Sequence, residues 1–453
     1  MAARSSSDSG HWPKRFAGLA GAWLGVSLIK FGNPVILDRL VESPKDFWEI
    51  VFNPWPVAWG YWMLAGLVIL GGGVVRFKTS APRWLVALPM IWFGWQLVAA
   101  TRTVDVQLTK ATLLHFGACN ACFYLGLFAL SRVSQMTWFW NSLLLGFVWV
   151  LWMGLCQHFG GLEATRQMIS QQPNWQQLPP EYLIRMASNR IFSTLVYPNA
   201  LAGAILLLLP PSLAVLFKMT VRLPNIVRGV LVGSLAYAGL ACLYWSGSKS
   251  GWLITLALGL VALLRLPLTR QVKLGVVGVI LAVGLAGFFV KFSGYFHRGA
   301  TSVSARFDYW RAAWEITKNH PILGSGPGTF SVAYKKIKAP GAEMTRLVHN
   351  NYLEQACDSG VLGFLAFSAF VFGALAVLYR KLNMDLIHFA VLVGVLGWAA
   401  QGFVEFGLYI PAITWPAFLF LGWLLGSGIE FDNHQWTKYP SVTHEEDLVS
   451  ERA

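Results

Sequence analysis

The feature that most constrains this chain is a series of apolar runs, each of about 20 residues, that recurs along most of its length. A run of this length crosses about 30 Å of hydrocarbon as an α-helix, because each residue adds about 1.5 Å. Only 12% of the 453 residues are charged and 55% are hydrophobic, which leaves too few charges for the surface of a soluble protein. The sequence therefore predicts a polytopic membrane protein of the all-α class.

Hydropathy predicts about twelve membrane-spanning helices. Two of the connections between them, over about 159–196 and 293–358, are long. The second lies between the ninth and tenth spans, and we expect it to be partly helical. The predicted spans lie near 16–32, 56–75, 84–100, 111–130, 136–158, 197–217, 227–246, 250–266, 273–292, 359–379, 386–409 and 412–429.

The short connections on one side of the predicted membrane are rich in lysine and arginine. Because basic residues gather in short cytoplasmic loops, this side is predicted to be the cytoplasm. The N-terminus over 1–15 and an acidic tail over 430–453 are then cytoplasmic and flank a membrane domain over 16–429, while both long segments are extracytoplasmic. The basic residues of these connections are Arg76, Lys78, Arg83, Arg132, Lys218, Arg222, Arg228, Arg265, Arg270, Lys273, Arg380 and Lys381.

The formal net charge of +14 is explained by these basic connections and by an anionic substrate, so we predict no nucleic acid partner. Cys119 and Cys122 form a CxxC within an apolar run, where we expect them to pack between helices rather than to bind a metal or exchange disulfides. No Asp-x-Asp pair or acidic cluster is apparent. We therefore predict that the protein needs no metal ion and no other cofactor.

The second long segment contains an amphipathic pattern. Phe307, Trp310 and Trp314 follow one another at i, i+3 and i+7, with charged residues on the other faces. This spacing predicts a helix with an aromatic stripe suited to the membrane interface, and His320-Pro321 should end it. A glycine-rich turn is predicted next, at Gly324, Gly326 and Gly328.

The sharpest motif is a histidine followed at a fixed distance by two glycines. It begins with His349-Asn350 and continues, after nine residues, with Gly360-Val-Leu-Gly363. The run before it, starting at Arg306, reads RFDYWRAAWEITKNHPILGSGPGTF.

Two further elements lie upstream, Tyr197-Pro198-Asn199-Ala200 and Ser248-Lys249-Ser250. Together with the histidine motif they cover about 190–370. This set resembles the signature of the bacterial O-antigen ligase and O-antigen polymerase family of membrane glycosyltransferases.

The resemblance implies an inverting, metal-independent transfer of a glycan from undecaprenyl pyrophosphate to an acceptor hydroxyl on a lipid A core sugar or another glycan. It also implies a place in the bacterial inner membrane, an active site that faces the periplasm, and a role in lipopolysaccharide or other surface polysaccharide biosynthesis. His349 is then the catalytic residue at the acceptor hydroxyl, because an imidazole takes up a proton near neutral pH. The implied pyrophosphate-binding residues are Arg306, Lys249 and Arg190, and the supporting residues are Asn350, Gly360, Gly363, Asn199 and Glu405.

Two of these residues raise alternatives of their own. The family pattern usually has arginine where this chain has Lys249, which keeps the charge but loses the planar fork that grips two phosphate oxygens. We expect Lys249 still to contact the phosphate; the alternative is a branch with a rebuilt site. Glu405 lies near the end of the eleventh predicted span, where an ionisable group is costly and often functional. Packing against a neighbouring arginine or lysine is the other interpretation.

Two rival functions remain. A repeat-unit polymerase would use another lipid-linked repeat as the acceptor, and a transporter would move lipid-linked glycan without chemistry. Twelve spans are also typical of transporters built from two six-helix halves. Here the connection after the sixth span, about 218–226, is short and no repeat is evident, which argues against that architecture.

Overall fold

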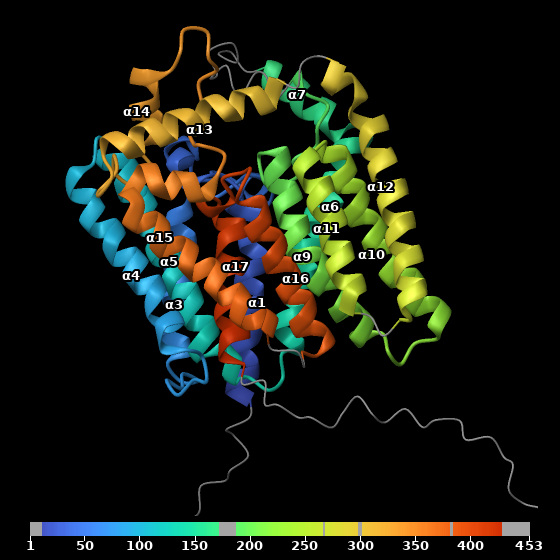
Figure 1. Cartoon of the computed structure of the whole chain (residues 1–453). Helices are drawn as coiled ribbons and strands as arrows, with labels where there is room; N and C mark the ends of the chain where they lie inside the picture. The colour runs from blue at the N-terminus through green and yellow to red at the C-terminus, as the bar shows by residue number, and fades with distance from the viewer. Residues whose placement is uncertain (1–10, 172–186, 266–267, 298–300, 381–383, 428–453) are drawn as a thin grey trace, which may run out of the picture.

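The computed structural model describes residues 11–171, 187–265, 268–297, 301–380 and 384–427. All regular secondary structure in these ranges is helical. The long helices run side by side in one bundle (Figure 1). The predicted acidic tail over 430–453, most of the predicted N-terminal segment, and part of the first long loop lie outside the described residues.

A helix overlaps each of the twelve predicted spans. Within the described residues, seven helices are long and apolar enough to cross a membrane by length and composition, and three shorter apolar helices accompany them. The all-helical membrane class is therefore confirmed, whereas the count of twelve crossings stays a prediction. The helices that overlap the predicted spans are α1 (His11–Lys30), α3 (Val57–Gly71), α4 (Arg83–Ala99), α5 (Val106–Phe128), α6 (Thr137–Cys156), α9 (Pro198–Met219), α10 (Asn225–Ser246), α11 (Lys249–Arg265), α12 (Arg270–His297), α15 (Asn351–Arg380), α16 (Leu386–Gln401) and α17 (Pro411–Gly426).

Helix α17 forms the centre of the bundle, because every residue from Pro411 to Gly426 is buried. Its closest neighbour is α5. A Cβ added at Gly422 would lie 1.9 Å from the Phe123 carbonyl oxygen, and one at Gly126 would lie 2.2 Å from that of Leu419. Small residues therefore let these two backbones touch, which is how helices pack in a membrane without a hydrophobic driving force.

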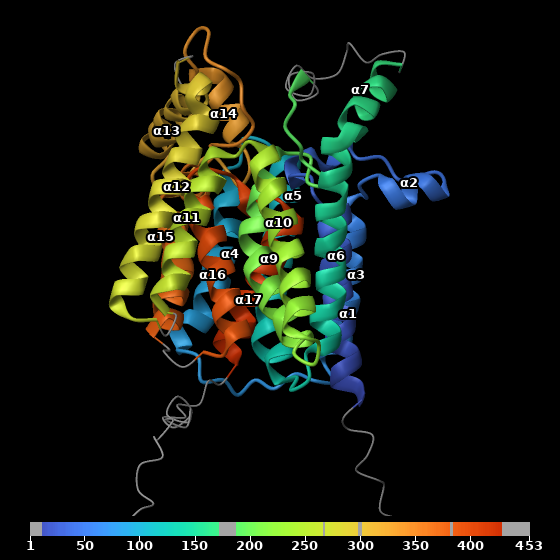
Figure 2. The same cartoon turned by 90° about the vertical axis from the view of Figure 1, so that its right-hand side faces the viewer.

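The basic connections gather at one end of the bundle. Arg132 donates a hydrogen bond to the Lys78 carbonyl oxygen at 2.6 Å, which joins two of these connections. At the same end, the Lys218 ammonium lies 2.9 Å from the Asp385 carboxylate. The helices α13 (Thr301–Asn319), α14 (Phe330–Ile337) and α7 (Leu162–Ser170) lie at the opposite end (Figures 1 and 2). The basic connections and the helices of the long segments therefore lie at opposite ends of the bundle, and the side of the membrane that each end faces stays a prediction.

The second long segment contains the predicted amphipathic helix, α13. It ends at Asn319, directly before His320-Pro321. Phe307 and Trp314 are exposed, each at 55%, and the opposite face, with Tyr309 and Ile316, packs against α14 and α15. The predicted glycine-rich turn follows, and its glycines have positive φ: Gly324 at 64°, Gly326 at 107° and Gly328 at 73°.

Two span boundaries differ from the prediction. Helix α15 begins at Asn351 rather than near 359 and is kinked at Ser359 and Gly360, so its first part is a buried segment that precedes the predicted tenth span. Helix α16 ends at Gln401, whereas the eleventh span was predicted to reach 409. The apolar run continues past that helix end through a turn and a short 3-10 helix, and hydropathy does not distinguish these from a helix.

The remaining short elements connect these helices. The first long loop starts with α7, which follows α6 after a kink at Phe159 and Gly160. These short connecting elements are η2 (Val35–Leu40), α2 (Phe47–Phe52), η3 (Ala100–Arg102), η4 (Leu130–Arg132), η5 (Gln157–Gly161) and η7 (Gly407–Tyr409).

Candidate functional site

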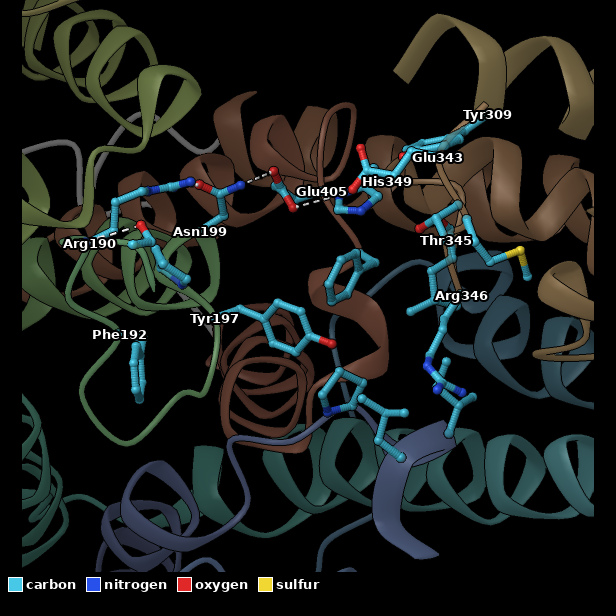
Figure 3. Close-up of a pocket in the computed structure, with 18 residues that line it drawn as sticks. Arg190, Phe192, Tyr197, Asn199, Tyr309, Glu343, Thr345, Arg346, His349 and Glu405 are labelled. Carbon is cyan, nitrogen blue, oxygen red and sulfur yellow. Dashed lines mark hydrogen bonds and ion pairs between the residues drawn. The ribbon is translucent and has the colours of Figure 1, made fainter. Parts of the chain in front are cut away.

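A cavity of about 300 Å³ lies where several segments distant in sequence meet. Its walls come from the start of η2, from residues 188–199, from α13, from the loop 343–349, and from the turn before η7. Figure 3 shows Arg190 and Arg346 on opposite sides of this cavity, with Glu405 and His349 between them. The cavity brings together three of the predicted site residues from one loop and two turns, along with Asn199 from the start of α9.

Glu405 is the centre of the polar network. It lies in the turn after α16, not within a span as predicted, and it is only 5% exposed. One carboxylate oxygen, Oε1, accepts hydrogen bonds from Asn199 Nδ2 at 2.5 Å and from Arg306 Nη2. The other oxygen, Oε2, lies 3.1 Å from His349 Nδ1. This one carboxylate therefore connects three of the residues named by the sequence.

The carboxylate of Glu405 is held in its charged form. Burial raises the pKa of Glu405, but the charges of Arg306 and His349 and the hydrogen bonds from both residues oppose that effect. The net result is a pKa below the usual range for glutamate. A buried carboxylate with a guanidinium partner is thus a fixed negative charge beside the imidazole.

The contact with Glu405 determines the tautomer of His349. An ionised carboxylate can only accept, so Nδ1 carries a proton, and in the neutral imidazole Nε2 carries the lone pair. Among the described residues, Nε2 has no hydrogen-bond partner. The ring is also held on both sides, stacked at 5.8 Å on Tyr309 and edge-on at 4.7 Å to Phe406. The arrangement is that of an oriented general base.

The backbone at His349 adopts an unusual conformation. Its φ is 55°, in the left-handed region that non-glycine residues seldom occupy and that is often found at functional sites. The neighbouring residues hold the turn in place. The Val348 N–H donates to Glu354 Oε2 at 2.5 Å, and the Asn351 N–H donates to the Gly402 carbonyl oxygen at 2.7 Å.

Asn350, predicted as a supporting residue, caps helix α15. Its Oδ1 accepts hydrogen bonds from the backbone N–H groups of Tyr352 and Leu353, both at 3.0 Å. An asparagine at this position satisfies donors that the first helical turn leaves unpaired. Asn350 therefore fixes where α15 begins, directly after the histidine, and its side-chain oxygen is occupied by the protein itself.

Arg190 lines the cavity and is partly committed to the protein. Its Nε donates to the Ser246 carbonyl oxygen and its Nη2 to Asn199 Oδ1, both at 2.7 Å. Within the described residues, Nη1 has no hydrogen-bond partner. Asn199 therefore links Arg190 to Glu405, and Gln401 Nε2 fixes the Asn199 carbonyl oxygen at 2.7 Å. Arg190 and the Pro-Asn element, which the sequence named separately, are therefore in contact.

Arg306 lies next to the cavity rather than on its wall. Besides Glu405, its guanidinium donates to the carbonyl oxygens of Val404 at 3.1 Å and Ser302 at 3.2 Å. It is thus the counter-ion of Glu405 and braces the start of α13 against the turn that carries this carboxylate. Direct binding of pyrophosphate by Arg306 stays a prediction.

Lys249 lies outside the cavity wall. Its Nζ sits over the rings of Tyr295, at 3.8 Å from the ring centre, and Phe292, at 5.2 Å, both in α12. Such cation–π contacts hold a lysine without neutralising it. Lys249 lies just before the predicted span 250–266; burial first, and then the charges of Arg190 and Arg306, lower its pKa to about 8. The cations of the site are therefore close enough to repel one another electrostatically.

The two glycines of the motif have structural roles. A Cβ at Gly360, where φ is 72°, would lie 2.1 Å from the Ile322 carbonyl oxygen, so the kink in α15 lets the glycine-rich segment pass close by. A Cβ at Gly363 would lie 1.9 Å from Ser359 Oγ. Neither glycine lines the cavity.

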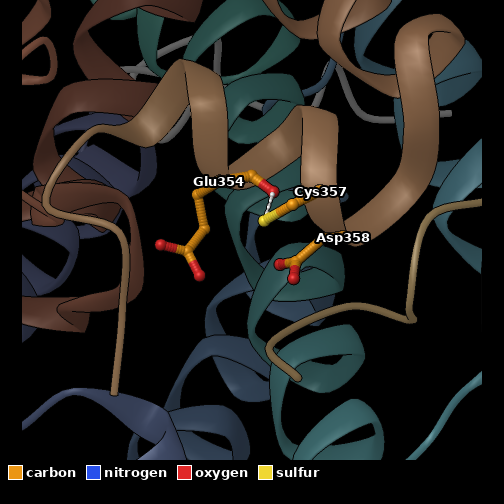
Figure 4. A group of neighbouring side chains, drawn as sticks. All are labelled: Glu354, Cys357 and Asp358. Atoms are coloured by element: carbon orange, nitrogen blue, oxygen red, sulfur yellow. Dashed lines mark hydrogen bonds between the residues drawn. The ribbon is translucent and has the colours of Figure 1, made fainter. Parts of the chain in front are cut away.

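A second acidic group lies beneath the histidine turn. Glu354, Cys357 and Asp358, on the first part of α15, place one ligand atom each within 4.8 Å of the others, and all three are fully buried (Figure 4). We predicted no acidic cluster from the sequence, and that prediction is corrected here: the three residues stand at i, i+3 and i+4 within the histidine motif itself.

This group could hold a divalent cation or share a proton. Asp358 Oδ2 accepts from the Gly328 N–H at 2.7 Å and from the Tyr409 hydroxyl at 2.6 Å. The other oxygens, Glu354 Oε1 and Asp358 Oδ1, are buried and have no hydrogen-bond partner within the described ranges. Two carboxyl groups in this position favour a shared proton or a bound metal ion.

Sequence reasoning missed the aromatic walls of the site. Tyr309 and Phe406 line the cavity and hold the imidazole. Tyr309 lies two residues after Phe307, on the buried face of α13, whereas the predicted aromatic stripe lies on the exposed face. A signal was present, since Tyr309 falls on the opposite face of the same helix, where buried residues are expected.

The fold and the cavity define a multi-pass helical membrane protein with an oriented imidazole and arginines at one end of its bundle. A family model described as O-antigen ligase matches residues 233–368, which include Lys249, Arg306 and His349. This match confirms the resemblance to the O-antigen ligase family. An uncharacterized protein of Haemophilus influenzae is 33% identical over 88 residues, which are 18% of this chain and 22% of that relative. The match thus spans less than a quarter of the relative's length.

Proposed function

We propose that this protein transfers a glycan from undecaprenyl pyrophosphate to an acceptor hydroxyl on the periplasmic face of the bacterial inner membrane. The observation that carries the proposal is the Glu405–His349 pair, in which a charged carboxylate orients an imidazole in a cavity with arginines on and beside its wall. The O-antigen ligase match over 233–368 supports the same reaction class.

The proposed step is a single displacement. His349 Nε2 takes the proton of the acceptor hydroxyl as its oxygen attacks the anomeric carbon of the donor glycan. The new carbon–oxygen bond forms opposite the bond to pyrophosphate, which breaks with its electron pair, so the anomeric centre inverts. Glu405 stabilises the imidazolium that results, as carboxylates do in comparable pairs.

The leaving pyrophosphate needs positive charge, and the cations near the cavity supply it. Arg190 lines the cavity, and among the described residues its Nη1 has no hydrogen-bond partner. Arg306 cancels the charge of Glu405, and Lys249 adds a further cation nearby. Fixed donors of this kind stabilise a departing anion in the transition state. We therefore propose a reaction without a metal ion, since the buried group at Glu354 lies off the cavity wall.

The proposed orientation places this cavity in the periplasm and both termini in the cytoplasm. It is supported by the gathering of basic connections at the end of the bundle opposite α13 and α14. Single cysteines at 170 and 335 should react with a membrane-impermeant thiol reagent in cells with a permeabilised outer membrane, and one at 222 should not. Labelling at 222 alone would reverse the orientation.

The test of the reaction is transfer by the purified protein in lipid nanodiscs. With a lipid-linked glycan and an acceptor, a new glycosidic bond should form, and His349→Ala should lose the product. His320→Ala, a histidine of the same loop that does not line the cavity, is the matched control and should stay active. A protein that moves the lipid-linked glycan across the bilayer and leaves its bonds unchanged would be a transporter.

The acceptor distinguishes a ligase from a repeat-unit polymerase. Deletion of the gene, followed by gel analysis of the surface glycan, separates the two. Core without attached polymer indicates a ligase that uses the lipid A core, whereas core with a single repeat indicates a polymerase.

A further inference from the structure

A second, larger cavity adjoins the one that holds His349. Its volume is about 1160 Å³, and it is built by η2, the start of α5, one face of α14 and the loop before His349. The two cavities share Ile36, Met344 and Arg346 as wall residues, so they are neighbours across one partition. Small-molecule pockets commonly have about 300–1,000 Å³, so the second cavity has room for a ligand of several sugar rings.

The walls of the second cavity carry an excess of positive charge. Arg39, Lys335, Lys336 and Arg346 line it, against only Asp38 and Asp105. Both acids are used by the fold. Asp38 Oδ1 accepts from the Val57 N–H at 2.8 Å, and Asp105 Oδ1 caps α5 through two backbone N–H groups at 3.0 Å.

The lysines are presented by a helix that is anchored from its other side. Phe330 and Tyr334 of α14 are buried against α13 and α15. Lys335 and Lys336 are exposed on the cavity side, and within the described residues neither forms an ion pair. A flexible ammonium of this kind is a point charge well suited to a phosphate group. The cavity thus offers cations whose charge the protein does not cancel.

We infer that the second cavity is the acceptor site and that it binds a phosphorylated oligosaccharide. The inference rests on the proposed function and adds the chemical class of the acceptor. The phosphate groups would lie against Lys335 and Lys336, and the reacting hydroxyl would reach His349 past the shared wall at Met344 and Arg346. Donor and acceptor then approach the imidazole from two different cavities.

The experiment compares two acceptors and two pairs of variants. The acceptors are the phosphorylated core oligosaccharide of lipopolysaccharide and the same oligosaccharide after phosphatase treatment. The double variant Lys335→Ala with Lys336→Ala should raise KM for the phosphorylated acceptor about tenfold or more, and leave KM for the donor unchanged. The matched control, Arg311→Ala with Lys318→Ala, removes two cations from α13 that line neither cavity, and should change neither KM.

Direct binding separates failure of this inference from failure of the proposed function. Binding of the phosphorylated oligosaccharide to the protein in nanodiscs is measured without donor, and it should weaken with added salt and with the lysine pair removed. Such binding supports the inference even where no transfer is seen, an outcome that would count against the proposed function instead. Equal affinity for the two oligosaccharides, or an equal loss of affinity in the control pair of variants, would overturn the inference that the second cavity binds the phosphorylated acceptor.

Discussion

Two acidic groups lie close to His349, and their surroundings are opposite. Glu405 is surrounded by donors that carry or share positive charge: Arg306, His349 and the amide of Asn199. Glu354 and Asp358 are sealed in, with backbone N–H groups and a tyrosine hydroxyl as donors and no cation among the described residues. One group faces a cavity, and the other is enclosed by protein.

The two groups support His349 in different ways, Glu405 by its charge and Glu354 by holding the backbone. Glu405 acts on the imidazole electrically, because its charge fixes the tautomer at Nδ1 and stabilises an added proton. Glu354 acts on the same residue through the backbone, because its carboxylate holds the Val348 N–H and so supports the strained turn at His349. A substitution that removes only charge should therefore harm the first group and spare the second.

The largest effect is expected at the histidine itself. Substitution His349→Ala removes the proposed base and should lower the transfer rate by about 10²–10⁴. Donor binding should change little, because the imidazole is assigned to the acceptor side. The measurement is single-turnover transfer together with donor binding, with the amount of folded protein checked. A His349→Ala protein that transfers at the normal rate would remove the proposed role.

The next effect should come from the ion pair. Substitution Arg306→Ala leaves the Glu405 charge buried without its main partner, which commonly costs about 3–5 kcal/mol of stability. Loss of the cation should also slow transfer by about 100-fold. The double variant Arg306→Ala with Glu405→Gln should recover much of the thermal stability but not the rate. Equal stability of the single and double variants would show that the pair is not electrostatically coupled.

A smaller effect is expected from pH. The pKa of Lys249 is lowered to about 8, so the ammonium loses its proton as pH rises through that value. Only the charged form attracts pyrophosphate, so donor KM should be constant below pH 7 and rise about tenfold by pH 9. Lys249→Arg keeps its charge across this range and should flatten the profile without loss of activity. An inactive Lys249→Arg protein would indicate a phosphate site rebuilt around the smaller ammonium.

The smallest effect should come from neutralising the sealed group. Glu354→Gln keeps the shape of the side chain and an acceptor for the Val348 N–H, so the transfer rate should stay within about threefold of normal. Glu354→Ala removes the support of the turn and should lower the free energy of unfolding by about 1–3 kcal/mol. Transfer should also survive excess chelator. A loss that magnesium, manganese or zinc restores would show that these carboxylates hold a metal ion.

Hydropathy, loop charge and one motif were enough to predict the membrane class, the approximate position of every long helix, and His349 and its arginines as candidates. These features are local: hydropathy over about 20 residues, charge in short loops, and a motif within one segment. The two wrong boundaries, in α15 and α16, arose where an apolar run continues through a kink or a turn. At these positions, packing against neighbouring helices rather than chain composition determines where the helix begins or ends.

Which of the candidate side chains are in contact with one another depends on the packing of segments that are distant in the chain. Glu405 is 206 residues from Asn199 and 56 from His349, yet its two carboxylate oxygens contact both. No periodicity links such distant positions, because the packing of α9 against α16 brings them together. The packing of α11 against α12 likewise puts Lys249 over aromatic rings beyond the cavity wall. Local pattern names the chemical groups, whereas their protonation and partners depend on long-range contacts and on exclusion of water.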